Sequence, residues 1–204
     1  MSNLVVFVAF QDEEPEPFVH DMAFYERLFN DPAPGANSVY AYFRHSSYGS
    51  LSWTSSFCPA PAGPKGYYQP KGEINTLGYS DDVEAAAREQ ALAKEIGQWL
   101  DSNVPADVSI DADGDGFVDN VTLVFAGASD VSSRYKLWPH RSDLIASADK
   151  AVTIHGKKMV SFIMVFDRSN GFDIMRDLPI TTGVLCHEMS HSLGTYDLYH
   201  AADR

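Results

Sequence analysis

The chain has 204 residues, with 15 basic and 28 acidic side chains and a formal net charge of −13. This length is typical of one domain with a sizeable core, and the acidic excess, without any cluster of Lys and Arg, argues against a nucleic-acid partner. No apolar run is long enough to span a membrane, and two cysteines are too few for a disulfide framework.

The first half of the chain is predicted to alternate strands with helices. An apolar run at 4–10 indicates a buried strand, and its lack of a basic start argues against a signal peptide. Helical spacing at 20–29 ends at the breaker sequence NDPAPG, and an aromatic-rich helix follows at 38–45. Residues 51–57 alternate like a strand, whereas the four prolines and three glycines of 58–72 predict an irregular loop.

The second half is predicted to hold a long helix, a strand, a hairpin and a final helix. In chain order these are a helix capped by Ser80 or Asp81 that runs to about Asn103, a strand at 121–126 after an acidic loop at 107–119, a hairpin of 151–154 with 159–166 around HGKK, and a helix at 181–193 ended by Gly194. This order of elements indicates an α/β or α+β fold.

The final predicted helix carries His-Glu-x-x-His at 187–191. Side chains four residues apart lie on one face of a helix, so His187 and His191 can bind one metal ion. Glu188 lies beside such an ion rather than on it, where hydrolysis needs a general base. A catalytic zinc ion takes three protein ligands and keeps one position open, so the motif requires a third ligand.

Asp197 is the predicted third ligand. It stands six residues after His191, and Gly194, three residues after that histidine, tolerates the backbone conformation of a sharp helix exit. A carboxylate oxygen is an accepted zinc ligand. A Glu on a later helix is excluded, because none of the thirteen residues after His191 is Glu. His200 is the alternative.

Several other residues allow both a structural and a functional interpretation. Cys186 adjoins the first histidine but points about 100° away from it on a helix, so it is predicted to be a small buried hydrophobe. A bridge to Cys58 and two free thiols are both compatible with the sequence.

Two further residues could take part in catalysis. His140 is predicted to be structural, with an approach to the scissile carbonyl as the alternative. Tyr199 is predicted to pack rather than to assist an oxyanion. A serine nucleophile is unsupported, because no Gly-x-Ser-x-Gly motif is present.

The sequence DADGDGFVDN predicts a calcium loop. Its ligands would be the carboxylates of Asp111, Asp113, Asp115 and Asp119 and the backbone carbonyl of Phe117. Thr122 replaces the Glu of an EF-hand and a strand follows instead of a helix, so the ion would serve to fix the loop before the strand at 121–126. Carboxylates this close repel one another unless a cation lies among them. The alternative is a solvated Asp-Gly turn.

The zinc motif extends through Asp197-Leu198-Tyr199 and resembles that of the immune inhibitor A family of secreted bacterial zinc metalloproteases, a branch of the metzincins. Other blocks resemble family segments in the same order: LVVFVAFQD at 4–12, SVYAYFRHSSYGSLSW at 38–53, DADGDGFVDNVTLVFAG at 111–127 and LWPH at 137–140. The likeness therefore extends over nearly the whole chain.

This resemblance implies an exported zinc endopeptidase that acts on proteins or peptides, with zinc on His187, His191 and Asp197 and with Glu188 as the general base. It implies a metzincin-like catalytic lobe over 1–204, with a twisted, mostly parallel sheet, a backing helix and an active-site helix. Metzincins continue into a lower lobe with a methionine-containing turn, which Met189 is not. We therefore expect the sequence to be a fragment that lacks most of this lobe, the signal peptide and the propeptide.

A different class of function is also compatible with the sequence. The protein would then be a calcium-stabilised surface or binding domain with a vestigial, inactive protease site. Glu188 weighs against this hypothesis, because a metal site kept only for structure needs no base.

Overall fold

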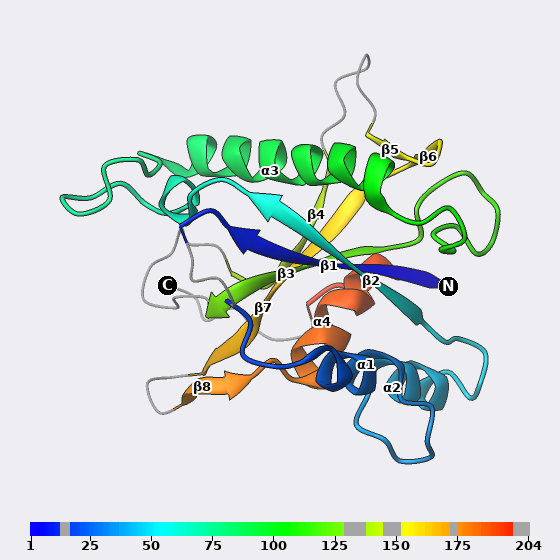
Figure 1. Cartoon of the computed structure of the whole chain (residues 1–204). Helices are drawn as coiled ribbons and strands as arrows, with labels where there is room; N and C mark the ends of the chain where they lie inside the picture. The colour runs from blue at the N-terminus through cyan, green and yellow to red at the C-terminus, as the bar shows by residue number, and fades with distance from the viewer. Residues whose placement is uncertain (13–16, 129–137, 145–151, 172–174, 198–204) are drawn as a thin grey trace.

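The computed structural model describes residues 1–12, 17–128, 138–144, 152–171 and 175–197, and it shows a mixed α/β fold. A curled, mostly parallel sheet has the long helix α3 (Asp82–Asn103) on one face. Helices α1 (Met22–Asn30), α2 (Val39–Ser46) and α4 (Thr182–Ser192) lie on the other face (Figure 1). The predicted mixed α/β class with a mostly parallel sheet is confirmed, whereas the metzincin-like lobe stays a prediction.

The main sheet has six strands in the described residues. Its order is β2 (Thr54–Ala62), β1 (Ser2–Phe10), β3 (Val121–Ala128), β7 (Ser161–Gly171) and β4 (His140–Asp143), and β8 (Met175–Pro179) pairs with β7. The first four strands run parallel, whereas β4 and β8 are antiparallel to β7. Because helices cover both faces, β1 is a continuous buried apolar run from Leu4 to Val8, as its sequence predicts.

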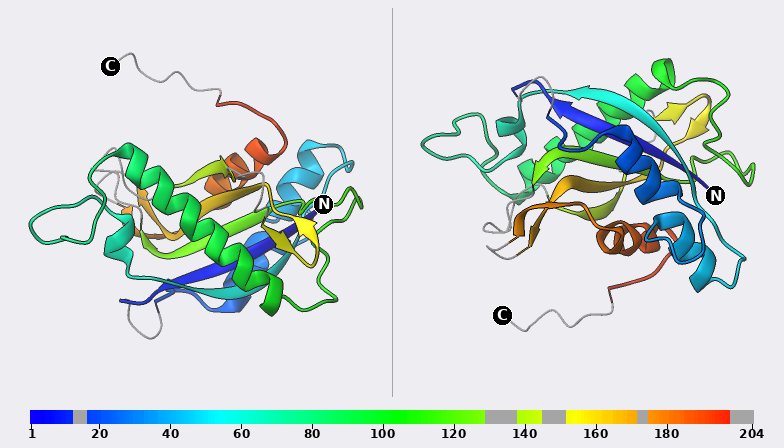
Figure 2. Two further views of the ribbon diagram at one scale, coloured as in Figure 1. Left: turned by 90° about the horizontal axis from the view of Figure 1, so that it is seen from above. Right: turned by 60° about the horizontal axis from the view of Figure 1, so that its bottom comes forward.

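Helix α3 covers one face through an apolar stripe. Its buried residues Leu92, Ala93, Ile96 and Leu100 recur at helical spacing and pack in one core with alternate residues of β1, β3 and β7. The helix begins where the Asp81 carboxylate accepts a hydrogen bond from the Glu84 amide at 2.9 Å, which confirms the predicted cap. Figure 2 shows α3 lying across the strands in its left view.

The opposite face holds the three shorter helices, which the right view of Figure 2 brings forward. Each helix begins at a side-chain cap: Asp21, Ser38 and Thr181 accept a hydrogen bond from the amide three residues later. Buried side chains of the helices, among them Tyr25, Phe29, Phe43 and Met189, pack with Val5 and Val124 of the sheet. The buried face of α4 is thereby packed against the sheet, and the opposite face of the helix remains accessible.

Two predictions from the sequence are wrong in part. The strand predicted at 51–57 begins only at Thr54, and it continues to Ala62 through the first part of the predicted loop at 58–72. Pro59 and Pro61 are tolerated because β2 pairs only with β1 among the described strands, and an edge strand does not need every N–H in the ladder. Residues 65–68 of the same predicted loop form a short 3-10 helix, Lys65–Tyr68.

The hairpin predicted around HGKK is much smaller than expected. It consists of β5 (Thr153–Ile154) and β6 (Lys157–Lys158), joined by His155 and Gly156, which both have positive φ as a two-residue hairpin turn requires. Residues 161–166 belong instead to β7 and pair with β3. In the part of the chain that the structure describes, no helix combines the length and the apolar character that crossing a membrane requires.

Candidate metal centre

Helix α4 presents two imidazoles side by side. Leu185, Cys186 and Met189 are buried against the sheet, and this packing leaves His187 and His191 on the accessible side. The centroids of the two imidazole rings lie 4.9 Å apart. The spacing of four residues therefore places both histidines on one face of the helix, as predicted.

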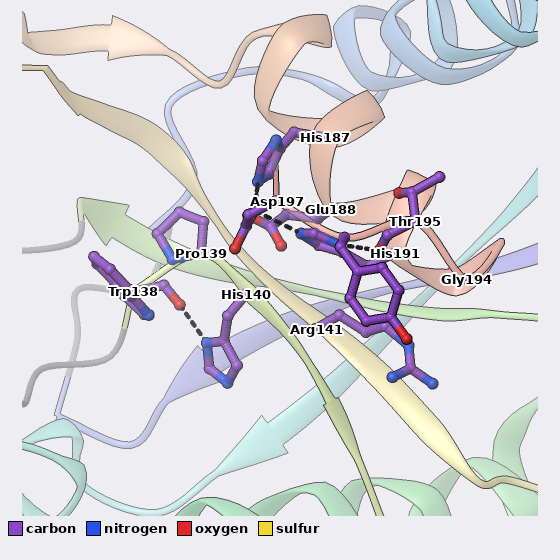
Figure 3. A pocket seen from close by; sticks show the side chains of 11 residues that line it. Trp138, Pro139, His140, Arg141, His187, Glu188, His191, Gly194, Thr195 and Asp197 are labelled. Carbon is purple, nitrogen blue, oxygen red and sulfur yellow. Dashed lines mark hydrogen bonds and ion pairs between the residues drawn. The ribbon is translucent and has the colours of Figure 1, made fainter. Parts of the chain in front are cut away.

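The chain leaves α4 sharply and returns to the two histidines. Gly194 has a φ of 85°, a conformation that glycine adopts without steric cost. Asp197 Oδ1 then lies 3.2 Å from His187 Nε2 and 3.3 Å from His191 Nε2 (Figure 3). The structure thus brings together the three ligands predicted from the sequence. The alternative ligand His200, and Tyr199, lie outside the described residues.

The donor atoms of this cluster fit a zinc ion. Each of the three residues offers one nitrogen or oxygen atom, and these atoms lie within 4.8 Å of one another. His191 Nδ1 lies 2.9 Å from the Thr195 carbonyl oxygen, to which it donates, and this bond orients the ring with Nε2 toward Asp197. Two imidazole nitrogens and a carboxylate are a donor set that catalytic zinc ions use.

Glu188 lies next to the cluster and is 6% exposed. Burial raises the pKa of its carboxyl group above the ordinary value, the nearby His187, His191 and His140 lower this pKa in part, and Asp197 raises it further. A carboxylate that is buried beside a candidate metal centre in this way is suited to accepting a proton. The structure therefore places the predicted general base at the same site as the predicted ligands.

A cavity of about 420 Å³ opens over the cluster. One wall comes from α4 and the segment that follows it, through His187, Glu188, His191 and 194–197. The other wall comes from 138–141, which include the start of β4. Since β4 ends the sheet in the described part of the chain, the cavity lies beside a sheet edge.

His140 borders this cavity, but its ring nitrogens are engaged elsewhere. Nε2 lies 3.0 Å from Glu89 Oε1 of α3, and Nδ1 lies 2.8 Å from the Trp138 carbonyl oxygen. Burial alone lowers the pKa of the imidazole, but the hydrogen bond with Glu89 and its negative charge outweigh this effect and raise the pKa overall. His140 is thus tied to α3, and the structural role expected of it stays a prediction.

The acidic loop assembles part of the predicted calcium site. Carboxylate oxygens of Asp111, Asp113 and Asp115 lie within 4.8 Å of one another. Asp119 does not join them, because its Oδ2 accepts hydrogen bonds from the amides of Ser2 at 2.6 Å and Ala112 at 3.1 Å. The calcium site itself stays a prediction.

Two further groups in this loop bear on that prediction. Phe117, proposed as a carbonyl ligand, donates its amide to Asp115 Oδ1 at 2.8 Å. Lys157 Nζ lies 2.7 Å from Asp111 Oδ2, and this hydrogen bond lowers the pKa of the Asp111 carboxyl group. A lysine therefore already supplies part of the positive charge that the acidic loop needs.

The two cysteines are free and buried, which decides between the two alternatives that the sequence left open. Burial raises the pKa of Cys186 to about 12, so its thiol is neutral near pH 7. Two residues of the cavity wall were not predicted from the sequence: Glu89, which holds His140, and Arg141, which lines the cavity. Only the position of Arg141 directly after Leu-Trp-Pro-His could have pointed to it.

Comparison of the sequence with known protein families finds no match, and neither does comparison with curated proteins. The resemblance to the immune inhibitor A family therefore stays a prediction that rests on the motifs described above.

Proposed function

We propose that the protein is a zinc-dependent endopeptidase with a metzincin-like catalytic lobe, of the kind found in the immune inhibitor A family. The observation that carries this proposal is the convergence of His187, His191 and Asp197 beside the buried Glu188. The resemblance further supports a location outside the cell or at its surface.

In this proposal His187, His191 and Asp197 hold the zinc ion. When bound, zinc supplies Lewis-acid chemistry: it polarises a peptide carbonyl and lowers the pKa of a water molecule. Glu188 takes the proton of the attacking water and later delivers it to the leaving amine. The buried position of Glu188, which raises its pKa, suits both halves of this proton transfer.

The position of β4 in the cavity wall is evidence for a polymeric substrate. An extended peptide can add to an exposed sheet edge through its main chain, with alternate side chains on opposite faces. Strand β4 is such an edge among the described strands, and the residues at its start line the cavity that contains Glu188. A peptide lying along β4 would therefore pass the candidate metal centre.

The proposal is tested with the full-length protein, loaded with zinc and incubated with unfolded casein over a range of pH. We expect cleavage, and a loss of about 100-fold or more in rate for Glu188→Gln, because removing a general base typically costs that much. The matched control is Glu26→Gln, which changes an exposed carboxylate on α1. Equal behaviour of the wild type and Glu188→Gln at every pH would contradict the proposal.

A further inference from the structure

The edge strand carries an arginine on the side of the metal centre. In the antiparallel pairing of β4 with β7, Arg141 lies opposite Ile163 and His140 lies opposite Met164. Ile163 belongs to the core beneath α4, whereas Met164 belongs to the core beneath α3. Since paired residues point to the same face of a sheet, Arg141 faces the side of α4, and His140 faces away from it.

The Arg141 side chain is only partly used by the protein. Its Nη2 donates to Asp143 Oδ1 at 2.6 Å, and its Nε is buried with no hydrogen-bond partner among the described residues. The Asp143 side chain is 74% exposed, so this ion pair contributes little to stability and exchanges readily. Because Nε is enclosed, a group that enters the cavity can reach Arg141 only through its Nη donors.

Arg141 also differs from the other side chains around the cavity. It is the only Lys or Arg among the described residues that line it, and it shares the cavity with His187, His191 and Asp197 (Figure 3). A guanidinium group offers five donors in a planar arrangement that matches a carboxylate. The side chains of a peptide added along β4 would alternate between the two faces, and those on the α4 face would lie beside Arg141.

We infer that Arg141 determines specificity by binding an acidic side chain, Asp or Glu, of an extended peptide substrate. This inference rests on the proposed peptidase function and names the substrate class of the same site. The substrate carboxylate would accept hydrogen bonds from the Nη donors that Asp143 does not use. A lysine at the same substrate position would be repelled by Arg141.

The test uses a peptide that the zinc-loaded protein cleaves, together with versions that carry Glu, Gln or Lys at each position on either side of the cleaved bond. For the wild type we expect kcat/KM to be about tenfold higher with Glu than with Gln at one position, the scale of one charge-assisted hydrogen bond. Arg141→Gln should reduce this ratio to about one, and Arg141→Glu should favour Lys.

Two further variants separate this role from effects on folding. Asp143→Asn removes the competing carboxylate and should increase the preference for Glu, which a purely structural role of Arg141 would not produce. Arg27→Gln makes the same change of charge at an exposed site on α1 and should leave the preference unchanged. Thermal unfolding of each variant reports whether the fold is retained.

The inference can fail separately from the proposed function. If the wild type cleaves peptides without any preference for an acidic residue, or if Arg141→Gln keeps the preference, the inference is overturned and the peptidase function stands. If no peptide is cleaved, fluorescence anisotropy of labelled peptides with the zinc-loaded protein decides. Tighter binding of the Glu peptide, lost in Arg141→Gln, would support the role of Arg141, and equal binding of the Glu and Gln peptides would overturn it.

Discussion

At the scale of single residues, the candidate metal centre depends on one backbone conformation. Gly194 adopts a φ of 85° at the end of α4, and three residues later Asp197 reaches both imidazoles. The motif spacing predicts this cluster from the sequence because all its members are close along the chain. Arg141 and Glu89 were not predictable in the same way, since long-range contacts across the sheet bring them to the cavity wall.

Replacing Gly194 by Ala should weaken zinc binding. A Cβ atom at this position meets no atom within 4 Å, so the cost arises from the positive φ alone, about 1 kcal/mol. Relief of this strain would move Asp197, and we expect the zinc dissociation constant to rise about tenfold. Gly35→Ala is the matched control, because Gly35 has a φ of 79° and equally open surroundings. Unchanged zinc affinity in Gly194→Ala, measured by titration calorimetry, would contradict this account of the turn.

His140 should make stability depend on pH. Its pKa is raised in the folded protein by the hydrogen bond with Glu89 of α3, by the negative charge of Glu89 and, to a smaller extent, by that of Glu188 of α4. The stabilisation is therefore complete below the unfolded pKa of about 6.5 and is lost as the pH rises through the folded value. In urea unfolding, His140→Gln and Glu89→Gln should each reduce the loss of stability between about pH 6 and about pH 8. If both variants retain the wild-type dependence of the unfolding free energy on pH, the His140–Glu89 pair is not its cause.

At the scale of elements, the predictable parts of the fold are those with a local cause. Helices α1, α2, α3 and α4 have caps and apolar periodicity, and β1 and β3 contain the apolar runs 4–10 and 123–126. Strand β4 has four residues, all but one half-buried, and its sequence shows no apolar alternation. Strand β4 forms because it pairs with β7, so no local sequence pattern could reveal it. The same reason explains why β2 extends through prolines: its position at the sheet edge permits them.

Helix α3 approaches the segment before β5 so closely that a methyl group does not fit between them. A Cβ atom added at Gly97 would lie 2.4 Å from Val152 Cγ1 and 3.1 Å from Met159 Sδ. Gly97→Ala should therefore lower the free energy of unfolding by about 1–3 kcal/mol, despite the better helix propensity of Ala. The double variant Gly97→Ala/Val152→Ala should recover part of this loss. Denaturant unfolding measures both, and a stabilised single variant would contradict the packing.

Thermal unfolding in the presence of calcium tests both the predicted calcium site in the acidic loop and the alternative function as a binding domain. If calcium binds, millimolar calcium should raise the midpoint of thermal unfolding by a few degrees, and Asp113→Asn should abolish the rise. Asp143→Asn, an exposed carboxylate outside the loop, is the control. No shift in the wild type would mean that Lys157 and the backbone amides suffice to stabilise the loop. Calcium-dependent stability without any zinc binding would favour the binding domain over the peptidase.

At the scale of the whole molecule, the sheet separates a face that forms an apolar core from a face that carries the candidate metal centre. The face covered by α3 is a continuous apolar core, and the opposite face carries α4, whose buried side anchors it while its accessible side presents the histidines. The cavity forms where this second face meets the β4 edge. The class of fold was predictable from the order of elements, but the strand order was not, because parallel pairing between distant segments leaves no local pattern in the sequence.

The metal content of the purified protein tests the central claim most directly. After loading with zinc and dialysis, the wild type should retain about one equivalent per chain by elemental analysis. His187→Ala and Asp197→Ala should each lose it, whereas Glu188→Gln and Asp143→Asn should keep it. A wild type that retains no zinc, or an Asp197→Ala variant that holds it as firmly as the wild type, would contradict the assignment of His187, His191 and Asp197 as its ligands.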